Sequence, residues 1–584
     1  MTLRGGLGVD SGWRALLQGL SLSPLGLTVF RVLLGGTLLA DWFTLARWYE
    51  AFFSEGGLFR RHEVLEVADV FLPFFLGGEV WNRLLFLAIG LLAFLLLLGY
   101  RPRTTAFLLA LLLIALQQRN PWVWNTGHSL IPVFLLLGAL LPLEAGYGLA
   151  RFLLRDPAPD RVFAPTVLPF LVLLFAAYFT NSLAKDVDAY WLQGKGLWAA
   201  VESTHGKPLG VEFVRRYPEW ATLLSRLTFL LQAGGAFLLI APLWPLRLLA
   251  ILGFLGFHFF TWLFLDVGNF PWVMAAALLL LLPPEVGIWL SARLRRGLPQ
   301  AVVHYDGGCG FCRRVAQALV RAFMAEAELR PAEGEVRELL EARRSWVVEV
   351  EGRRYLEGEG FLGLLFASPF RSLAFLYRLP GVPRLLRFGY RWVADRRPSP
   401  EATRRWLPAP AFRPFTRLTL FLALAVSLAY GAYALNGPDN YNKAPEWLAS
   451  GLDSVGLAVA WGHFAPVGPG RHEWPLVQGV TLSGAVVDPW RWLISGDPTY
   501  SEAVPRYSIE RSGKEHWRKV WWGAWGKGEA NALRRKGMAR YLCSAWNRTH
   551  KGFDLLVSVT LYRAYANPGE GRARRLLMEH YLCM

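Results

Sequence analysis

Three ionisable side chains stand in or beside apolar stretches of the chain, where a charged group is costly and therefore informative. Lys185 directly follows an apolar run and precedes Asp186 and Asp188, His128 begins a second run, and His258 lies inside a third. A desolvated lysine loses its proton more readily than a solvated one, so Lys185 is a candidate base near neutral pH. The alternatives are a lysine that reaches out to the membrane surface, a lysine paired with an aspartate, and histidines that only pack between helices.

The composition is that of an integral membrane protein with soluble parts. Hydrophobic residues make up 54% of the 584 residues and charged residues only 18%, and the mean hydropathy is +0.29. Such a chain buries its apolar surface in membrane-spanning helices. We attribute the formal net charge of +18 to a cytoplasmic surface that faces anionic lipid. We therefore expect the lipid bilayer as a partner and no nucleic acid.

Apolar segments near the length of a membrane span predict a mostly α, polytopic helical bundle with about nine spans. They lie at residues 24–46, 82–100, 104–118, 128–146, 163–184, 220–243, 246–266, 271–291 and 415–435. The first 22 residues are polar and glycine-rich and predict no cleavable signal peptide, so the first span is expected to direct insertion.

Arginines at the ends of these segments predict the orientation in the inner (plasma) membrane. The N-terminus and residues 292–414 are expected to be cytoplasmic, and residues from about 437 onward extracytoplasmic. Arg60 and Arg61 disagree with this orientation, because they fall in a loop on the outer side. The arginines that fall on the cytoplasmic side, as expected, are Arg4, Arg14, Arg101, Arg103, Arg151, Arg155, Arg161, Arg293, Arg295 and Arg296.

This orientation places four ionisable groups in the outer half of the bilayer: Asp41, His128, Lys185 and His258. Ionisable groups at that depth tend to face a cavity or each other. We therefore expect the four to converge.

Three stretches carry a resemblance to a known family: WNTGHS at 124–129, the segment from Val167 to Gly196, and FHFFTWLFLDVGNFPW at 257–272. Together they resemble the membrane domain of vitamin K-dependent gamma-carboxylases and their bacterial relatives, the HTTM domain, over residues 1–292. Lys185 resembles a lysine of the wider family, and Trp191 and Gly194 resemble its W..G pattern. His128 resembles the histidine of the carboxylase WNNH, with one residue more in the spacing here.

The resemblance implies a quinol site reached from the lipid, with Lys185 as catalytic base. His128, His258, Asn125 and Trp124 would bind the cofactor or relay protons, while Asp41 and Arg31 look like structural partners. The implied cofactor is a menaquinone- or vitamin K-like quinol, with O2 and CO2 as further reactants. A protein or peptide substrate would then meet the site at the outer face.

The sharpest local motif is Asp306-Gly-Gly-Cys309-Gly-Phe-Cys312, between an apolar run at 301–305 and a helix-forming stretch. A strand, a CxxC pair and a helix make the thioredoxin-like redox arrangement. The helix N-terminus would stabilise the Cys309 thiolate, Cys312 would be the resolving thiol, and Asp306 and Arg313 would support them. The alternative is a zinc site, but it needs about four ligands and no second cysteine pair lies on this side, so we expect no metal.

The motif and the sequence after it, to about residue 397, resemble the DCC family of thiol-disulfide oxidoreductases. We therefore expect an inserted cytoplasmic thioredoxin-like α/β domain at 297–397. Its end, from Arg371 to Arg397, mixes arginine with aromatic and aliphatic residues and predicts helices that lie on the inner leaflet.

The remainder of the chain divides into two predicted parts. Residues 398–436 are a proline-rich linker and the ninth span, and residues 437–584 are a small extracytoplasmic, tryptophan-rich α+β domain. Cys543 and Cys583 stand on the oxidising side and are a possible disulfide, although their separation cannot be read from the sequence. No catalytic spacing stands out in this part.

Three functions remain open. The first is a quinol-dependent enzyme with epoxidation- or carboxylation-type chemistry, in which Lys185 is the base. The second is a membrane-anchored thiol-disulfide oxidoreductase without carboxylase activity. The third is a non-enzymatic scaffold for maturation, immunity or export.

Overall fold

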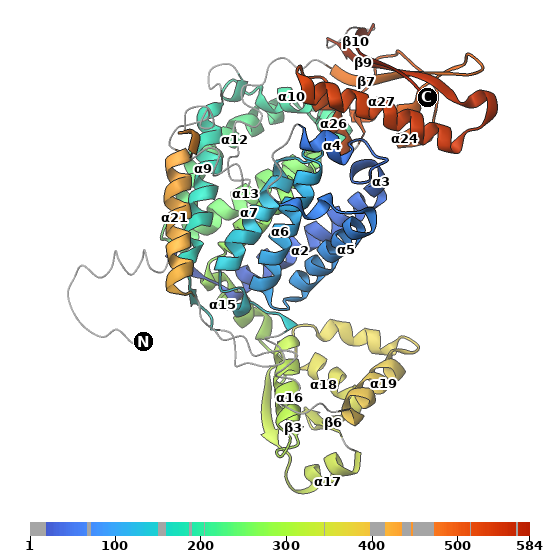
Figure 1. Cartoon of the computed structure of the whole chain (residues 1–584). Helices are drawn as coiled ribbons and strands as arrows, with labels where there is room; N and C mark the ends of the chain where they lie inside the picture. The colour runs from blue at the N-terminus through green and yellow to red at the C-terminus, as the bar shows by residue number, and fades with distance from the viewer. Residues whose placement is uncertain are drawn as a thin grey trace.

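The structure is a computed structural model that describes residues 19–66, 72–149, 159–185, 190–203, 205–343, 345–396, 415–434, 445–447, 472–507, 509–513, 515–567, 570 and 572–583. Three parts follow one another in Figure 1: a helical bundle, an α/β part at its lower end, and a C-terminal part at its upper end. The predicted linker at 398–414, the boundary at 437, and Asp186 and Asp188 lie outside the described residues.

The bundle has a helix in each of the predicted apolar segments. These helices are α2 (Pro24–Arg47), α5 (Glu79–Leu98), α6 (Pro102–Arg119), α7 (Thr126–Leu140), α9 (Leu168–Ala184), α12 (Pro218–Ile240), α13 (Trp244–Phe264), α14 (Phe270–Leu280), α15 (Pro284–Arg295) and α21 (Arg417–Ala434). The short elements α3 (Tyr49–Phe52), α4 (Arg61–Leu65), η1 (Pro73–Leu76), η2 (Leu143–Ala145), η3 (Pro165–Val167), α10 (Gly196–Val201) and α11 (Pro208–Arg216) connect them. Many side chains on the outside of the bundle are large and apolar, as a lipid-facing surface requires.

Fewer of these helices can cross a membrane than the sequence predicts. Within the described residues, six are long and apolar enough, and a seventh is added if α14 and α15 are counted as one broken span. The two meet at an angle of 86°, and Pro283 and Pro284 stand at the break, where a proline removes helical hydrogen bonds. Helix α7 has only 15 residues, or about 22 Å at 1.5 Å per residue. The prediction of about nine full spans is therefore not confirmed.

The α/β part contains a four-stranded mixed sheet with the strand order β4-β3-β5-β6. Strand β3 (Ala301–Tyr305) runs parallel to β4 (Ala327–Pro331) and antiparallel to β5 (Val347–Val350), which pairs with β6 (Arg353–Leu356). The helices of this part are α16 (Gly310–Ala322), α17 (Gly334–Arg343), α18 (Gly360–Phe366), η6 (Arg371–Arg378) and α19 (Val382–Asp395). It has its own apolar core, built around Val303, Val348 and Leu364.

The C-terminal part is an antiparallel sheet with helices packed against it. The strand order is β10-β9-β7-β8, formed by β7 (His472–Thr481), β8 (Val486–Val487), β9 (Leu556–Ala566) and β10 (Arg574–Leu582). The helices are α24 (Pro489–Ser495), α25 (Ile509–Ser512), α26 (Glu515–Ala524) and α27 (Glu529–Thr549). Buried residues of this part, such as Trp517 and Val520, belong to the same apolar cluster as Leu27 and Phe134 of the bundle. The two parts therefore share one core, and α26 lies against the upper end of the bundle (Figure 1).

Candidate functional site

A cavity of about 1260 Å³ lies among α9, α12, α13 and α14 and is closed at one end by α26. Most of its lining side chains are apolar. Its polar and charged residues include Asn125, Tyr178, Asn181, Lys185, His258, Asp266, Glu515, Arg518 and Lys519. Three residues predicted from the sequence, Asn125, Lys185 and His258, therefore share one cavity. Of the described residues, neither Trp124 nor His128 lines it, and nor do the two cysteines of the CxxC motif.

One face of α9 supplies three polar residues to this cavity. Tyr178, Asn181 and Lys185 follow one another at intervals of three and four residues, which places them on the same side of a helix. Helix α9 ends at Ala184, and Lys185 has extended backbone angles, with φ −73° and ψ 130°. Its side chain thus leaves the end of the span and remains in the cavity.

Lys185 is deeply buried, with 4% of its surface exposed. Its Nζ donates a hydrogen bond to Asn181 Oδ1 and lies 4.4 Å from the centre of the Trp191 ring. No carboxylate among the described residues forms an ion pair with it. Lys185 follows the span rather than belonging to it, and burial lowers its pKa to about 7. At neutral pH the amine therefore exists in both charged and neutral forms.

The W..G pattern has a structural explanation in the turn that holds Trp191. Gly194 has φ +85°, and a Cβ there would lie 2.3 Å from Thr222 Cγ2. A Cβ at Gly196 would lie 2.4 Å from the Trp191 ring. The two glycines thus allow the chain to turn tightly against α12 and to hold the indole beside Lys185.

His258 forms the second polar pair of the cavity. Its Nε2 lies 2.8 Å from Tyr178 Oη, and both side chains are buried. The Tyr178 ring stacks on Phe254 at a centroid distance of 3.7 Å, which fixes its position. His258 Nδ1 has no hydrogen-bond partner among the described residues. His258 can therefore offer a further ring nitrogen to a molecule in the cavity.

The C-terminal part supplies the charged end of the cavity. Arg518 Nη1 donates to Asp266 Oδ2 at 3.1 Å, which ties α26 to the segment after α13. Burial raises the pKa of Glu515 and lowers the pKa of Lys519. Lys519 Nζ also lies 4.9 Å from the centre of the Trp522 ring. Both signs of charge thus meet at this end.

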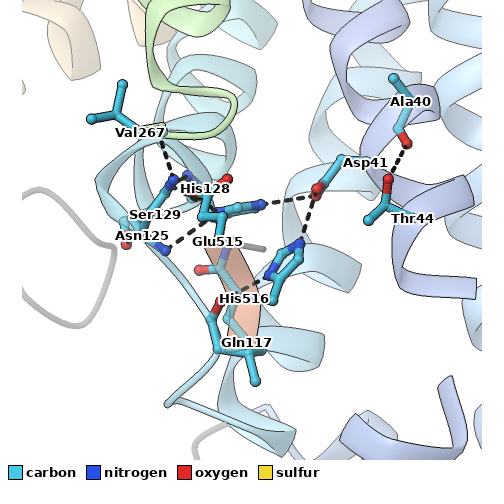
Figure 2. Close-up of polar contacts among 11 residues, drawn as sticks. Ala40, Asp41, Thr44, Gln117, Asn125, His128, Ser129, Val267, Glu515 and His516 are labelled. Carbon is cyan, nitrogen blue, oxygen red and sulfur yellow. Dashed lines mark hydrogen bonds and ion pairs between the residues drawn. The ribbon is translucent and has the colours of Figure 1, made fainter. Parts of the chain in front are cut away.

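A second polar cluster adjoins the cavity and contains Asp41, His128 and His516 (Figure 2). Asp41 Oδ2 lies 3.1 Å from His128 Nε2, and Asp41 Oδ1 lies 3.3 Å from His516 Nε2. Burial opposes a charge on His516, but the hydrogen bond and the negative charge of Asp41 outweigh it and raise the pKa of His516 to about 9. Asn125 belongs to both sites, because it lines the cavity and contacts the His128 ring.

Trp124 supports the Asp41–His128–His516 cluster from outside the cavity, whereas the hydrogen bonds of Arg31 go to other parts of the bundle. The Trp124 ring packs against His128 at 5.4 Å between centroids, and its Nε1 donates to Gln117 O at 3.2 Å. Arg31 is buried in α2 and donates to the carbonyl oxygens of Leu96, Leu97 and Tyr147. Arg31 therefore has a structural role: it joins α2 to the end of α5.

Comparison with known families assigns both the bundle and the α/β part. A family model of the HTTM domain matches residues 21–286, and a model of DCC1-like thiol-disulfide oxidoreductases matches residues 303–400. The chain is an HTTM domain fused to a DCC1-like domain. No curated protein and no solved structure matches it. The chain is thus a membrane protein that carries a redox domain.

The dithiol of the DCC1-like domain stands at the start of α16. Cys309 is the N-cap residue and is bonded to Cys312, and Cys309 Sγ accepts a hydrogen bond from Cys312 N at 3.2 Å. Asp306 Oδ1 accepts from Gly308 N and so shapes the loop before the cysteines. Arg313 lies in the first turn of α16. Figure 1 places this domain at the end of the HTTM bundle that lies opposite α26.

A second disulfide lies in the C-terminal part. Cys543 of α27 is bonded to Cys583, which follows β10, with a Cα–Cα distance of 5.6 Å. The bond fastens the last strand to the longest helix of this part.

Sequence reasoning missed the contribution of α26. Nothing in the local spacing of the C-terminal part indicates that it completes a site in the HTTM domain. The available signal is the mixture of charged residues and tryptophans in one short helix, Glu515, His516, Trp517, Arg518, Lys519, Trp521 and Trp522. Such a helix must bury charges as well as rings, and α26 buries both His516 and Arg518.

Proposed function

We propose that the HTTM cavity binds the ring of a membrane quinol and that Lys185 Nζ takes a proton from a quinol hydroxyl. The observation that carries the proposal is the burial of this amine in an apolar cavity with Asn181 and Trp191 as its partners. An amine held by an amide and an aromatic ring loses its proton at lower pH than one held by a carboxylate. Lys185 is therefore suited to be a base.

The shape and lining of the cavity fit an isoprenoid quinol. Its volume of about 1260 Å³ exceeds what a ring alone requires, and its lining is mostly apolar. Four lining leucines on α12 and α13 are also about half exposed: Leu227, Leu230, Leu249 and Leu252. A long apolar tail can thus enter from the lipid between these two helices while the ring reaches the polar end.

The polar residues of the cavity form two positions at which a quinol oxygen can bind. Asn181 Oδ1 accepts a hydrogen bond from Lys185 Nζ and so fixes the position of the amine in the cavity. The amine can gain or lose a proton while this hydrogen bond is kept. Tyr178 lies one turn before Asn181 on α9 and is hydrogen-bonded to His258 of α13. This pair can bind the second oxygen of the quinol. His258 Nδ1 is then available to pass a proton on.

A bound quinol would be the reductant. It would give two protons and two electrons to O2, forming the quinone and H2O2, or it would react with O2 to form the quinone epoxide and water. We propose O2 as the oxidant and CO2 as a second reactant, in line with the gamma-carboxylase resemblance. The charged end of the cavity, with Arg518 and Lys519, faces the C-terminal part and would meet a protein or peptide substrate at the outer face.

The proposal is tested with full-length protein in lipid nanodiscs. Reduced menaquinone is supplied, and its oxidation is followed by absorbance together with O2 uptake. We expect enzyme-dependent oxidation that falls to background in Lys185→Ala, whereas quinone binding, measured by quenching of tryptophan fluorescence, persists. The matched control is Lys195→Ala, because Lys195 is an exposed lysine ten positions further on. Oxidation at an equal rate by wild type and Lys185→Ala would refute the proposal.

We further propose that the DCC1-like domain is cytoplasmic and that the C-terminal part is extracytoplasmic, in an inner (plasma) membrane protein. The support is electrostatic. Arg161 forms an ion pair at 2.9 Å with Glu285 in the first turn of α15. Arg293, Arg295 and Arg296 stand at the end of the same helix, which leads into the DCC1-like domain. An excess of arginine at one end of a bundle favours the cytoplasmic side.

A second candidate activity rests on a different observation, the position of Cys309 at the N-terminus of α16. A helix N-terminus stabilises a thiolate. We propose that Cys309 is the attacking thiol and Cys312 the resolving thiol in the reduction of a disulfide substrate. In the reduced domain the Cys309 thiolate would attack the substrate disulfide, form a mixed disulfide and release one substrate thiol; Cys312 would then attack Cys309 Sγ, forming the Cys309–Cys312 bond and releasing the second substrate thiol. Mass spectrometry should find a mixed disulfide with a small disulfide substrate trapped in Cys312→Ser and absent in Cys309→Ser. A trapped complex in neither variant would contradict this role.

A further inference from the structure

Asp41, His128 and His516 come from three separate elements and meet at one point beside the cavity (Figure 2). Asp41 lies on α2, His128 in the first turn of α7, and His516 at the start of α26. We propose that these three side chains bind a divalent transition-metal ion such as Zn²⁺. The inference goes beyond the quinol site and does not depend on it, and it departs from the sequence-based expectation of no metal.

The spacing of the three groups agrees with metal coordination. The two histidine Nε2 atoms lie 3.1 Å and 3.3 Å from the two oxygens of Asp41. One potential ligand atom from each residue lies within 4.8 Å of the others. Ligands about 2.0–2.2 Å from a tetrahedral zinc ion are separated by about 3.3–3.6 Å from one another. Only a small adjustment of the side chains is therefore required.

The other ring nitrogens show which nitrogen of each histidine is free to coordinate. His516 Nδ1 lies 2.9 Å from Val123 O and therefore carries the proton. His128 Nδ1 lies 2.8 Å from Asn125 Oδ1, and also 3.3 Å from Asn125 N. In the tautomer in which His128 Nδ1 donates to Asn125 Oδ1, His128 Nε2 is free to coordinate. The donation from Asn125 Nδ2 to Val267 O at 3.0 Å orients the amide for this contact.

With an ion bound, both imidazoles would be neutral, and each would direct an Nε2 lone pair toward the ion that faces Asp41. Three electron-rich groups in one buried place repel one another unless protons or a cation lie between them. Metal-binding histidines typically donate their other N–H to a carbonyl or carboxylate oxygen, as both histidines do here. His128 is 2% exposed, and its Nε2 has no hydrogen-bond partner among the described residues despite the 3.1 Å approach of Asp41. A metal ion between His128 Nε2 and the Asp41 carboxylate would be a ligand partner for both groups.

Two histidines and one carboxylate are also a known zinc ligand set, found where one position remains for solvent or substrate. An ion here would fasten α26 to α2 and α7. It would also set one wall of the cavity, because Asn125 and Glu515, the neighbours of His128 and His516, both line it. The metal-free alternative is a pair of histidines that each contact Asp41 directly.

The test uses full-length protein, purified with a tag that lacks histidine and without chelators, and measures bound metals by inductively coupled plasma mass spectrometry. We expect a stoichiometric transition metal in wild type and its loss, by tenfold or more, in Asp41→Asn and in His516→Gln. His62→Gln is the matched control, because His62 is exposed. The double variant Cys309→Ser/Cys312→Ser tests the other group that could hold an ion, Asp306 with the two cysteines.

A measurement on unmutated protein guards against variants that fail to fold. Metal-stripped wild type is titrated with Co²⁺, and we expect the visible d–d absorption of a four-coordinate ion, abolished by equimolar Zn²⁺. Absence of both stoichiometric metal and these bands in wild type would overturn the proposal and leave the metal-free pair of histidines on Asp41. Metal that is lost only in the double cysteine variant would overturn it equally, since the ion would then belong to the dithiol.

Discussion

Lys185 donates a hydrogen bond from Nζ to Asn181 Oδ1, one helical turn earlier on the same face of α9. The relationship matters because an amide oxygen accepts a hydrogen bond from either a charged or a neutral amine and does not demand the charge, as a carboxylate does. The amide partner therefore distinguishes Lys185, which can act as a base, from a lysine that only forms an ion pair.

The pH dependence of quinol oxidation should report on Lys185. Because the pKa of Lys185 is lowered to about 7, the neutral amine prevails above pH 7 and is lost below it. We expect the turnover rate to fall along a one-proton limb as the pH drops through about 7. The measurement is the turnover rate between pH 5.5 and 9 at saturating quinol. A flat profile over this range would contradict the assignment of Lys185 as base.

The lowered pKa of Lys185 also makes the free energy of unfolding depend on pH. Between pH 7 and 10.5 the unfolded chain binds a proton at Lys185 that the folded chain does not, so the contribution to stability rises with pH in that window. Lys185→Met should weaken this rise relative to Lys195→Met, the exposed control. Denaturant midpoints at pH 7 and pH 9.5 provide the comparison, and an unchanged pH dependence in Lys185→Met would argue against burial of the amine.

The Tyr178–His258 pair should contribute both to stability and to ligand binding. Tyr178→Phe removes the hydroxyl from His258 Nε2 and leaves a buried nitrogen unsatisfied, which costs about 1–3 kcal/mol. We expect a lower unfolding midpoint and weaker quinone binding. Tyr49→Phe is the control, because Tyr49 is also buried but its hydroxyl has no hydrogen-bond partner among the described residues. Equal effects of the two substitutions would contradict the pair's role.

The Cys543–Cys583 disulfide should stabilise the C-terminal part. A bond that joins residues 40 positions apart lowers the entropy of the unfolded chain by an amount worth about 4 kcal/mol. We expect Cys543→Ser/Cys583→Ser to lower the denaturant midpoint seen by tryptophan fluorescence. The matched control is Cys309→Ser/Cys312→Ser, which opens a loop of only three positions. Coincident midpoints for the two double variants would show that the bond adds nothing.

The proposed orientation is tested by labelling exposed positions at the two ends of the molecule. Ser483 lies in the turn between β7 and β8, and Glu338 lies on α17 of the DCC1-like domain, and both are exposed. In cells, a membrane-impermeant maleimide should modify Ser483→Cys at once and Glu338→Cys only after permeabilisation. Modification of both in intact cells would place the two parts on one side of the membrane.

Much of the local structure could be predicted from the sequence, because it depends on neighbouring residues. The apolar segments form helices, and the CxxC motif lies between strand β3 and helix α16, since length and periodicity determine such elements. The spacing of Tyr178 and Asn181 relative to Lys185 places all three on one helix face, although of the three only Lys185 is a predicted site residue. The break at Pro283 and Pro284, in contrast, was concealed by the continuous apolar run on either side of it.

The remainder of the site could not be predicted, because it depends on tertiary packing. His516 lies 475 positions after Asp41, and no local pattern indicates that α26 packs against the end of α2. The sequence alone therefore indicates only a structural role for Asp41 and no catalytic spacing in the C-terminal part. The shared core of the two parts brings these residues together.

The most direct test of the central claim is the rate of quinol oxidation by Lys185→Arg. Arginine keeps the positive charge and the reach of lysine, but a guanidinium does not give up its proton. If Lys185 is the base, Lys185→Arg should lose about 100- to 10,000-fold in turnover, as Lys185→Ala does, while quinone binding is retained. Turnover by Lys185→Arg at the wild-type rate would show that only charge and reach matter at this position and would contradict the account.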